Sequence, residues 1–403
     1  MNAGSEERQL LADAVDGAVT AYRNKTRGQS LIMRDAPDEG VLAPVMAAIE
    51  GCEDYQAVVG QSLFAIGTVE PIKARQLAQL TLSRAEWKSP SDAVDWLLDV
   101  LGTKTATVIL KAAIWGISID VDIRLSESSC LMQFDKLPPT YGKGLIADRK
   151  KWQRSPFIWY SDRHFDMPLT AYTVEIIDVP FISDFDFEFA FAQIDEATRS
   201  AIEVCRMIEG VCVGHPLPLA YWLEFQDSEL NVISNANFLA WSLPEVYPQI
   251  KHVTQLSSNI IAEHYVSFCK LAHDWKADLR RSMDRYTLSQ CRHALIDRVL
   301  DLALAFEIAV SQKGDNLPVR WKVSVRAAQL IGGTMEERKS VRRAVGQLYE
   351  LRNKATHGST LAGAEREVVF QCTKIYQSLL RRLFEFAHRP DWNSIELESP
   401  SRS

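Results

Sequence analysis

Two residues near the C-terminus have the side chains needed to act on a phosphodiester. In LYELRNKATHG, residues 348–358, Arg352 precedes His357 by five positions. Histidine has a pKa near neutrality and can move the proton of a 2′-OH group, whereas arginine is a permanent cation that binds phosphate oxygens through paired N–H groups. A purely structural interpretation is also open, because basic residues and a glycine commonly end a helix.

The residues beside this pair could contribute to the same chemistry. The amide of Asn353 could hold the imidazole or a phosphate oxygen. Lys354 could contact a phosphate, although a solvated lysine on a helix surface fits the pattern better.

The element that positions these side chains is predicted to be a helix that begins with a capping box. Thr334 stands at the N-cap and Glu337 three residues later, and Gly358 is well placed to end the helix. Residues five apart on an ideal helix point about 140° apart. Arg352 and His357 can therefore converge only if the helix ends between them or if two chains build the site.

A second helix favours the two-chain arrangement. The segment 292–311, RHALIDRVLDLALAFEIAVS, is apolar on nearly all sides. Such a helix is buried on most of its surface, either in the core of a bundle or in a dimer interface.

The segment from Arg292 to Gly358 resembles the HEPN superfamily, specifically the ApeA-like HEPN domains of prokaryotic defence proteins. The resemblance rests on LALAFEIA with Glu307, on VSVRAAQLIGG with Arg326, and on LYELRNKATHG. The last of these fits the Arg-x4-His signature of the family, with the polar Asn353 directly after the arginine.

The resemblance implies a metal-independent endoribonuclease that needs no cofactor and acts on RNA. It implies a homodimer through the C-terminal helices, in which the two motifs face each other, and a role in antiviral defence by abortive infection after a phage-derived trigger. Glu307 and Arg326 could orient the site, but a buried ion pair that stabilises the bundle explains them equally well. The alternative functions are a catalytically inactive HEPN module for dimerisation or nucleotide binding, and an antitoxin-like sensor.

Composition is that of a soluble globular protein. The 403 residues are 47% hydrophobic and 24% charged. No signal peptide is evident, and the longest apolar stretch is interrupted by Lys111 and is too short to span a bilayer. The seven cysteines form no CxxC pair, so we expect reduced thiols, a cytoplasmic location and no membrane partner.

Charge is divided unevenly along the chain. Residues 280–389 hold 20 Lys and Arg against 11 Asp and Glu, whereas the remainder holds 25 against 41. A basic part that faces a polyanion and an acidic part of different function would give this distribution. One interpretation is that the first part senses the trigger and regulates the second; the alternative is that its acidic surface only keeps the protein soluble and the first part positions the substrate.

We predict an α+β fold that is predominantly helical. Residues 1–255 form a mixed region that opens with a helix over 5–26 and contains a small sheet between about 105 and 182. Residues 256–392 form the all-α HEPN bundle, and residues 393–403 form a disordered polar tail.

One acidic segment of the mixed region has a possible second chemistry. In DFDFEFAF, Asp184, Asp186 and Glu188 alternate with phenylalanines, which in a strand would put the carboxylates on one face. Clustered carboxylates can hold a hard cation. An amphipathic edge strand is the favoured interpretation, because no further ligand group is identifiable.

Overall fold

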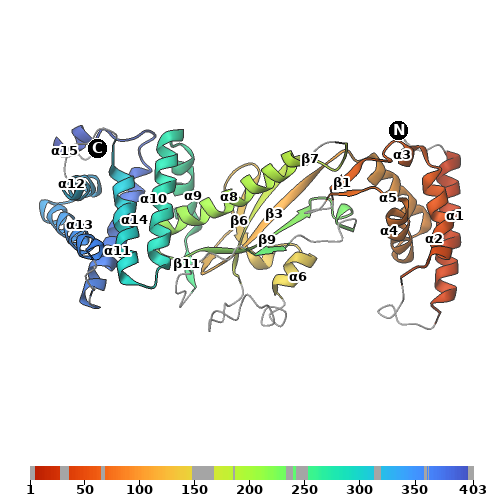
Figure 1. Cartoon of the computed structure of the whole chain (residues 1–403), viewed down its shortest axis with the longest axis horizontal. Coiled ribbons are helices and arrows are strands. Elements are labelled where there is room, and N and C mark those ends of the chain that lie inside the picture. The colour runs from red at the N-terminus through yellow and green to blue at the C-terminus, as the bar shows by residue number, and fades with distance from the viewer. Residues whose placement is uncertain are drawn as a thin grey trace. The chain divides into compact units, whose positions relative to one another are not determined.

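A computed structural model shows an α+β fold that is predominantly helical, as predicted (Figure 1). The structure describes residues 5–27, 36–64, 69–147, 168–184, 187–232, 239–241, 253–312, 319–357, 361 and 363–397. The chain divides into two compact units. The first comprises 1–111, 174–197 and 222–240, and the second comprises 112–173, 198–221 and 241–403.

The units do not divide at residue 255, where the sequence suggested a domain boundary. Three segments of the chain before 255 belong to the second unit, although all of 256–392 lies within it as well. The sequence-based boundary assumed that each unit is continuous in the chain. The chain instead passes between the units several times, through β3, β7, α8 and β9, whose bounds are given below.

The first unit contains a group of helices that pack side by side (Figure 1). The predicted opening helix is present as α1 (Ser5–Lys25). The others in the described part of this unit are α2 (Glu39–Glu50), the short α3 (Glu53–Gln56), α4 (Ala74–Trp87) and α5 (Pro90–Gly102). The start of α5 follows from local chemistry, because Ser89 accepts a hydrogen bond from the backbone N–H of Asp92 and Pro90 occupies the first turn.

The predicted sheet is present and includes strands beyond 105–182. Six strands have the order β10-β9-β3-β7-β6-β5, three have the order β2-β1-β8, and β11 pairs with β4 in parallel. Their bounds are β1 Ser62–Phe64, β2 Val69–Pro71, β3 Thr105–Trp115, β4 Ile117–Ile119, β5 Ile123–Arg124, β6 Ser129–Gln133, β7 Thr170–Pro180, β8 Ile182–Ser183, β9 Leu217–Phe225, β10 Leu239–Trp241 and β11 Thr254–Leu256. Short helical segments accompany them: η2 Phe134–Lys136, α6 Tyr141–Ala147 and η3 Leu230–Val232.

The acidic segment around residue 188 is not the edge strand that its alternation suggested. Glu188 begins α8 (Glu188–Val211), a helix of 24 residues. Phe187 and Phe191, one helical turn apart, both contact the ring of Phe64, at centroid distances of 5.8 and 6.0 Å. Ring contacts at i and i+4 explain the phenylalanine spacing as well as a strand would. Asp186 lies outside the described residues.

Most of the second unit consists of helices around a shared core. These are α9 (Ser258–Cys269), α10 (His273–Cys291), α11 (Leu295–Val310), α12 (Val319–Ile331), α13 (Met335–Thr356), η4 (Gly363–Glu365), α14 (Arg366–Leu383) and α15 (Trp392–Leu397). Figure 1 shows α10, α11, α13 and α14 side by side, and each packs on α11 or α14. In their core, the ring of Tyr376 stacks on Tyr286 at 4.5 Å and meets Phe306 edge-on at 5.4 Å.

The C-terminal segment also differs from its prediction as a disordered tail. Trp392 is fully buried and begins α15, and Glu396 pairs with the buried Arg326. Burial of the apolar surface of the indole favours an ordered segment over a disordered tail. Residues 398–403 lie outside the described residues.

The second half of α8 is anchored in the helical core of the second unit. Gln377 of α14 donates hydrogen bonds to the carbonyls of Glu209 and Cys212, and Arg381 donates one to the carbonyl of Val211. These side chains satisfy carbonyls that the end of a helix leaves without partners. The last turn of α8 is therefore part of the same packed structure as α14.

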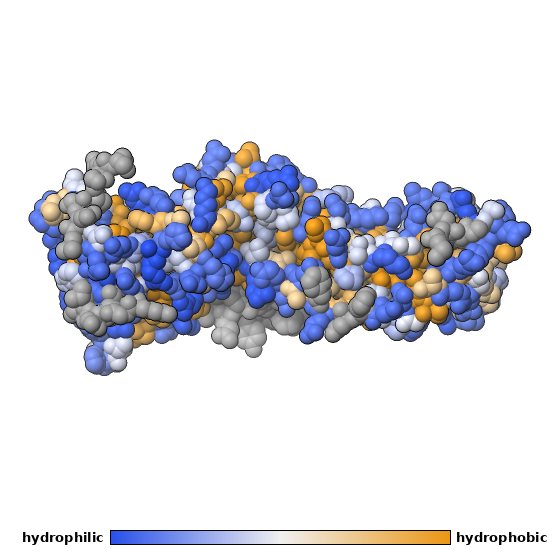
Figure 2. Space-filling view, turned by 90° about the horizontal axis from the view of Figure 1, so that it is seen from above, coloured by the Kyte–Doolittle hydropathy of each residue, from blue (hydrophilic) through white to orange (hydrophobic). Residues whose placement is uncertain are grey.

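The surface mixes polar and apolar residues. The face in Figure 2 is mainly hydrophilic, with smaller hydrophobic areas between. Within the described part of the chain, no helix combines the length and the apolar composition needed to cross a membrane.

Candidate active site

Helix α13 positions the Arg-x4-His residues. It begins with the predicted capping box, in which the Thr334 side chain accepts from the backbone N–H of Glu337 and the Glu337 side chain accepts from that of Thr334. At the other end, His357 is the C-cap residue, and its N–H bonds to the carbonyls of Asn353 and Lys354, each at 3.2 Å. Gly358 lies outside the described residues.

These end contacts decide how the two key side chains point. Because the N–H of His357 still makes the bond to the fourth residue before it, the helical path continues as far as His357. Arg352 and His357 therefore project about 140° apart around α13. The helix does not end early enough for one chain to bring them together.

Arg352 lies beside a carboxylate of α11. Its Nε is 3.4 Å from Oε1 of Glu307, and its side chain is 38% exposed. No other carboxylate in the described part of the chain pairs with this arginine. The Nε edge of the guanidinium faces Glu307, which leaves the two Nη groups for a phosphate.

Glu307 is held only loosely. Its side chain is 18% exposed, and its Oε1 is buried without a hydrogen bond among the described residues. Tyr349 of α13 lies against the same stretch of α11, where its hydroxyl donates to the carbonyl of Ala303 at 3.4 Å. Burial raises the pKa of Tyr349, and the charge of Glu307 and the approach of the hydroxyl to its carboxylate raise it further.

The remaining predicted residues of the motif lie at the surface. His357, Asn353 and Lys354 are exposed. The ammonium group of Lys354 pairs with Glu365, just before α14, at 3.2 Å. His357 and Asn353 are thus open to a large ligand, and Lys354 is held at the same end of the helix.

Arg326 is not part of this cluster. It is 1% exposed, and its Nε bonds to Glu396 at 2.6 Å while its Nη1 bonds to the carbonyl of Val310 at 2.6 Å. Its guanidinium also lies over the indole of Trp392, 5.1 Å from the ring centroid. Arg326 thus joins α12, α15 and the end of α11, which is a structural role.

A second arginine, Arg389, makes the same kind of contacts with the carbonyl that follows Val310 in the chain. Arg389 donates to the carbonyl of Ser311 at 2.6 Å, pairs with Asp278, and lies over Trp275 at 5.0 Å. Together the two arginines satisfy carbonyls at the C-terminal end of α11. They fix the helix end that carries Glu307.

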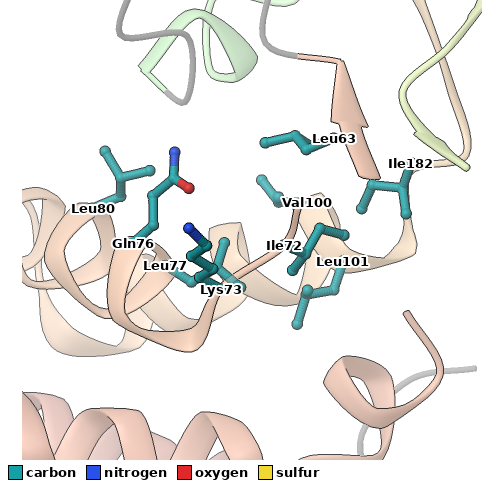
Figure 3. Close-up of a pocket in the computed structure, with 9 residues that line it drawn as sticks. All are labelled: Leu63, Ile72, Lys73, Gln76, Leu77, Leu80, Val100, Leu101 and Ile182. Carbon is teal, nitrogen blue, oxygen red and sulfur yellow. The ribbon is translucent and has the colours of Figure 1, made fainter. Parts of the chain in front are cut away.

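Metal ligation marks no further site in the described residues, and two hollows lie in the first unit. No group of three or more His, Cys, Asp or Glu is placed there to hold a metal ion. In the first unit, a cavity of about 10 Å³, no larger than one water, has mostly leucine, isoleucine and valine side chains around it, with Lys73 and Gln76 at one side (Figure 3). A more open hollow of about 300 Å³ in that unit is lined by Asp92, Asp99 and Asp227 among other charged residues.

The structure brings together some of the predicted residues and adds one. Arg352 and Glu307 meet, whereas Arg326 pairs elsewhere and His357 points away from Arg352. Tyr349 was missed, although it lies three residues before Arg352 and hence on the same side of the helix. That spacing was the available signal.

Comparison of the chain with protein-family models, curated proteins and solved structures finds no match in any of the three. The resemblance to HEPN domains therefore rests on LYELRNKATHG and its two accompanying segments.

Proposed function

We propose that this protein is a HEPN-type endoribonuclease that cleaves RNA without a metal ion, acts in the cytoplasm as an effector of antiviral defence, and is released by a phage-derived signal. The observation that carries the proposal is the placement of the motif on α13. A half-exposed arginine with a single, loose carboxylate partner and an exposed histidine stand at the end of one capped helix.

The proposed chemistry divides between the two side chains. His357 takes the proton from the 2′-OH, which attacks the adjacent phosphorus, and the same proton passes to the 5′-oxygen of the next nucleotide as the P–O5′ bond breaks and that oxygen leaves. Arg352 binds two non-bridging oxygens while the phosphorane carries extra negative charge. The products are a 2′,3′-cyclic phosphate and a 5′-OH, so no water or metal enters the first step.

For Arg352 and His357 to act on one phosphate, two copies of the chain are required, because the two side chains diverge within one helix. In a two-fold homodimer, Arg352 of one copy can face the partner's His357. Helix α11 offers a surface for such a contact. Leu300, Leu304 and Ile308 are half-exposed at four-residue spacing, next to Glu307.

The first prediction concerns the reaction itself. Purified protein incubated with total RNA in EDTA should cut it and leave 2′,3′-cyclic phosphate ends, since the nucleophile is the neighbouring 2′-OH. His357→Ala should abolish the cuts, because no other group is proposed to take the proton. Mapping the ends of the fragments by sequencing, with and without phosphatase treatment, provides the measurement.

A strict requirement for Mg²⁺ or Mn²⁺ would rule out this mechanism. A stable dimer that does not cut RNA would favour the inactive HEPN module instead.

A further inference from the structure

Glu307 presents a physical problem for the proposed site. It is a mostly buried carboxylate whose Oε1 has no hydrogen bond, and its one cation in the described part of the chain is Arg352, at 3.4 Å. A buried charge is costly unless it is paired and hydrogen-bonded. If Arg352 directs its charge to a phosphate, Glu307 loses most of what compensates it.

Tyr349 is placed to solve this problem. It is 3% exposed, and its hydroxyl makes a long bond of 3.4 Å to the carbonyl of Ala303. In a continuous α-helix that carbonyl already accepts the backbone N–H of Glu307, four residues later. A long bond to an acceptor that is already engaged is easily exchanged.

The positions of these residues along α13 and α11 are consistent with a contact between Tyr349 and Glu307. Tyr349 and Arg352 are three residues apart on α13, and Ala303 and Glu307 are four apart on α11, so each pair shares a side of its helix. Burial raises the pKa of Tyr349, and the charge of Glu307 and the approach of the hydroxyl to that carboxylate raise it further, so the hydroxyl keeps its proton and remains a donor.

We propose that Tyr349 is a positioning residue of the site, whose hydroxyl moves from the Ala303 carbonyl to the Glu307 carboxylate as Arg352 engages the scissile phosphate. Tyr349 touches neither RNA nor the reacting atoms. Its hydrogen bond to Glu307 compensates that buried charge and so lowers the free energy needed for Arg352 to turn to the phosphate in the transition state. The inference rests on the proposed nuclease function.

The test is Tyr349→Phe in the full-length protein, which removes only the hydroxyl from a buried ring. The kcat for RNA cleavage in EDTA should fall about tenfold, the value of one hydrogen bond to a charged group, and KM should stay within about twofold. The matched control is Tyr376→Phe. Tyr376 is fully buried in the same unit, and its hydroxyl bonds to Ser282 Oγ at 2.6 Å rather than to the Ala303 carbonyl. This control should keep the wild-type kcat even if its melting temperature falls.

A double-mutant cycle gives the second readout. Glu307→Gln removes the charge that needs compensation, so adding Tyr349→Phe to it should change kcat by less than about twofold. An unchanged kcat in Tyr349→Phe, an equal loss in Tyr376→Phe, or the same tenfold loss in the Glu307→Gln background would each overturn the inference.

These failures can be told apart from failure of the function. If the wild type cuts RNA in EDTA and His357→Ala does not, the nuclease stands whatever Tyr349→Phe does. If the wild type does not cut, the function and the inference both fall.

Discussion

At the scale of single residues, Arg352 and Arg326 differ in how their guanidinium groups are occupied. Arg326 is buried with a carboxylate, a carbonyl and an indole around it, whereas Arg352 is half-exposed beside one carboxylate that it does not hydrogen-bond. A guanidinium whose donors are satisfied has little left for a ligand. Arg352 is therefore the available arginine, and Arg326 holds the fold.

The second prediction follows from that availability. Arg352→Lys keeps the charge but loses the planar pair of donors, so kcat should fall about a hundredfold while RNA binding changes little. The control is Arg343→Lys, an exposed arginine on the opposite side of α13, nine residues earlier. Single-turnover cleavage and RNA binding in EDTA measure both effects. A lysine variant with wild-type cleavage would mean that Arg352 does not bind the phosphate in the transition state.

Sequence reasoning reached the motif residues but not their partners. The types and spacing of Arg352, Asn353 and His357 are local facts, and so they could be read directly. The pairing of Glu307 with Arg352, and of Arg326 with Glu396, depends on how α11, α12 and α15 pack. No spacing within one segment specifies such a contact.

At the scale of elements, local signals predicted the start of α13 and failed for α8. The capping box specified the start of α13 because its hydrogen bonds lie within four residues. The alternating phenylalanines before α8 suggested a strand, but ring contacts to Phe64 are tertiary. Between α9 and α10 the chain breaks at 270–272, where the N–H of Ala272 bonds to the carbonyl of Ala387, and this contact too is tertiary.

The third prediction concerns Arg326, one of the two arginines that hold the end of α11. Arg326→Ala leaves the Glu396 carboxylate and the Val310 carbonyl without their donor and should cost about 3 kcal/mol of stability. Arg320→Ala removes an exposed pair with Glu350, 2.5 Å apart, and should cost little. Thermal melting of both variants measures the difference. Equal melting temperatures would show that the buried contacts of Arg326 contribute little.

At the scale of the whole molecule, the two units are interleaved in sequence. The second unit takes in 112–173 and 198–221 in addition to the C-terminal helices. This arrangement could not be read from the sequence, because long-range strand pairing and helix docking decide it. The uneven charge along the chain, by contrast, needed only counting, and its link to regulation stays a prediction.

The fourth prediction follows from the interleaving. A fragment of residues 256–403 should not fold cooperatively, since it lacks the α8 carbonyls that Gln377 and Arg381 bind. It also lacks Gly210, which packs so closely on α14 that a Cβ there would lie 2.5 Å from Leu380. Circular dichroism melting beside the full chain tests this. A sharp transition near the temperature of the intact protein would contradict it.

The claim that two chains build one site is tested most directly by mixing two inactive variants. Arg352→Ala and His357→Ala chains, coexpressed with different tags, should each be inactive alone. The heterodimer purified through both tags retains one of the two Arg352–His357 pairs across the interface, so it should show about half of the wild-type RNA cleavage. If the heterodimer forms and cleaves no RNA, the site is not shared between two copies of the chain.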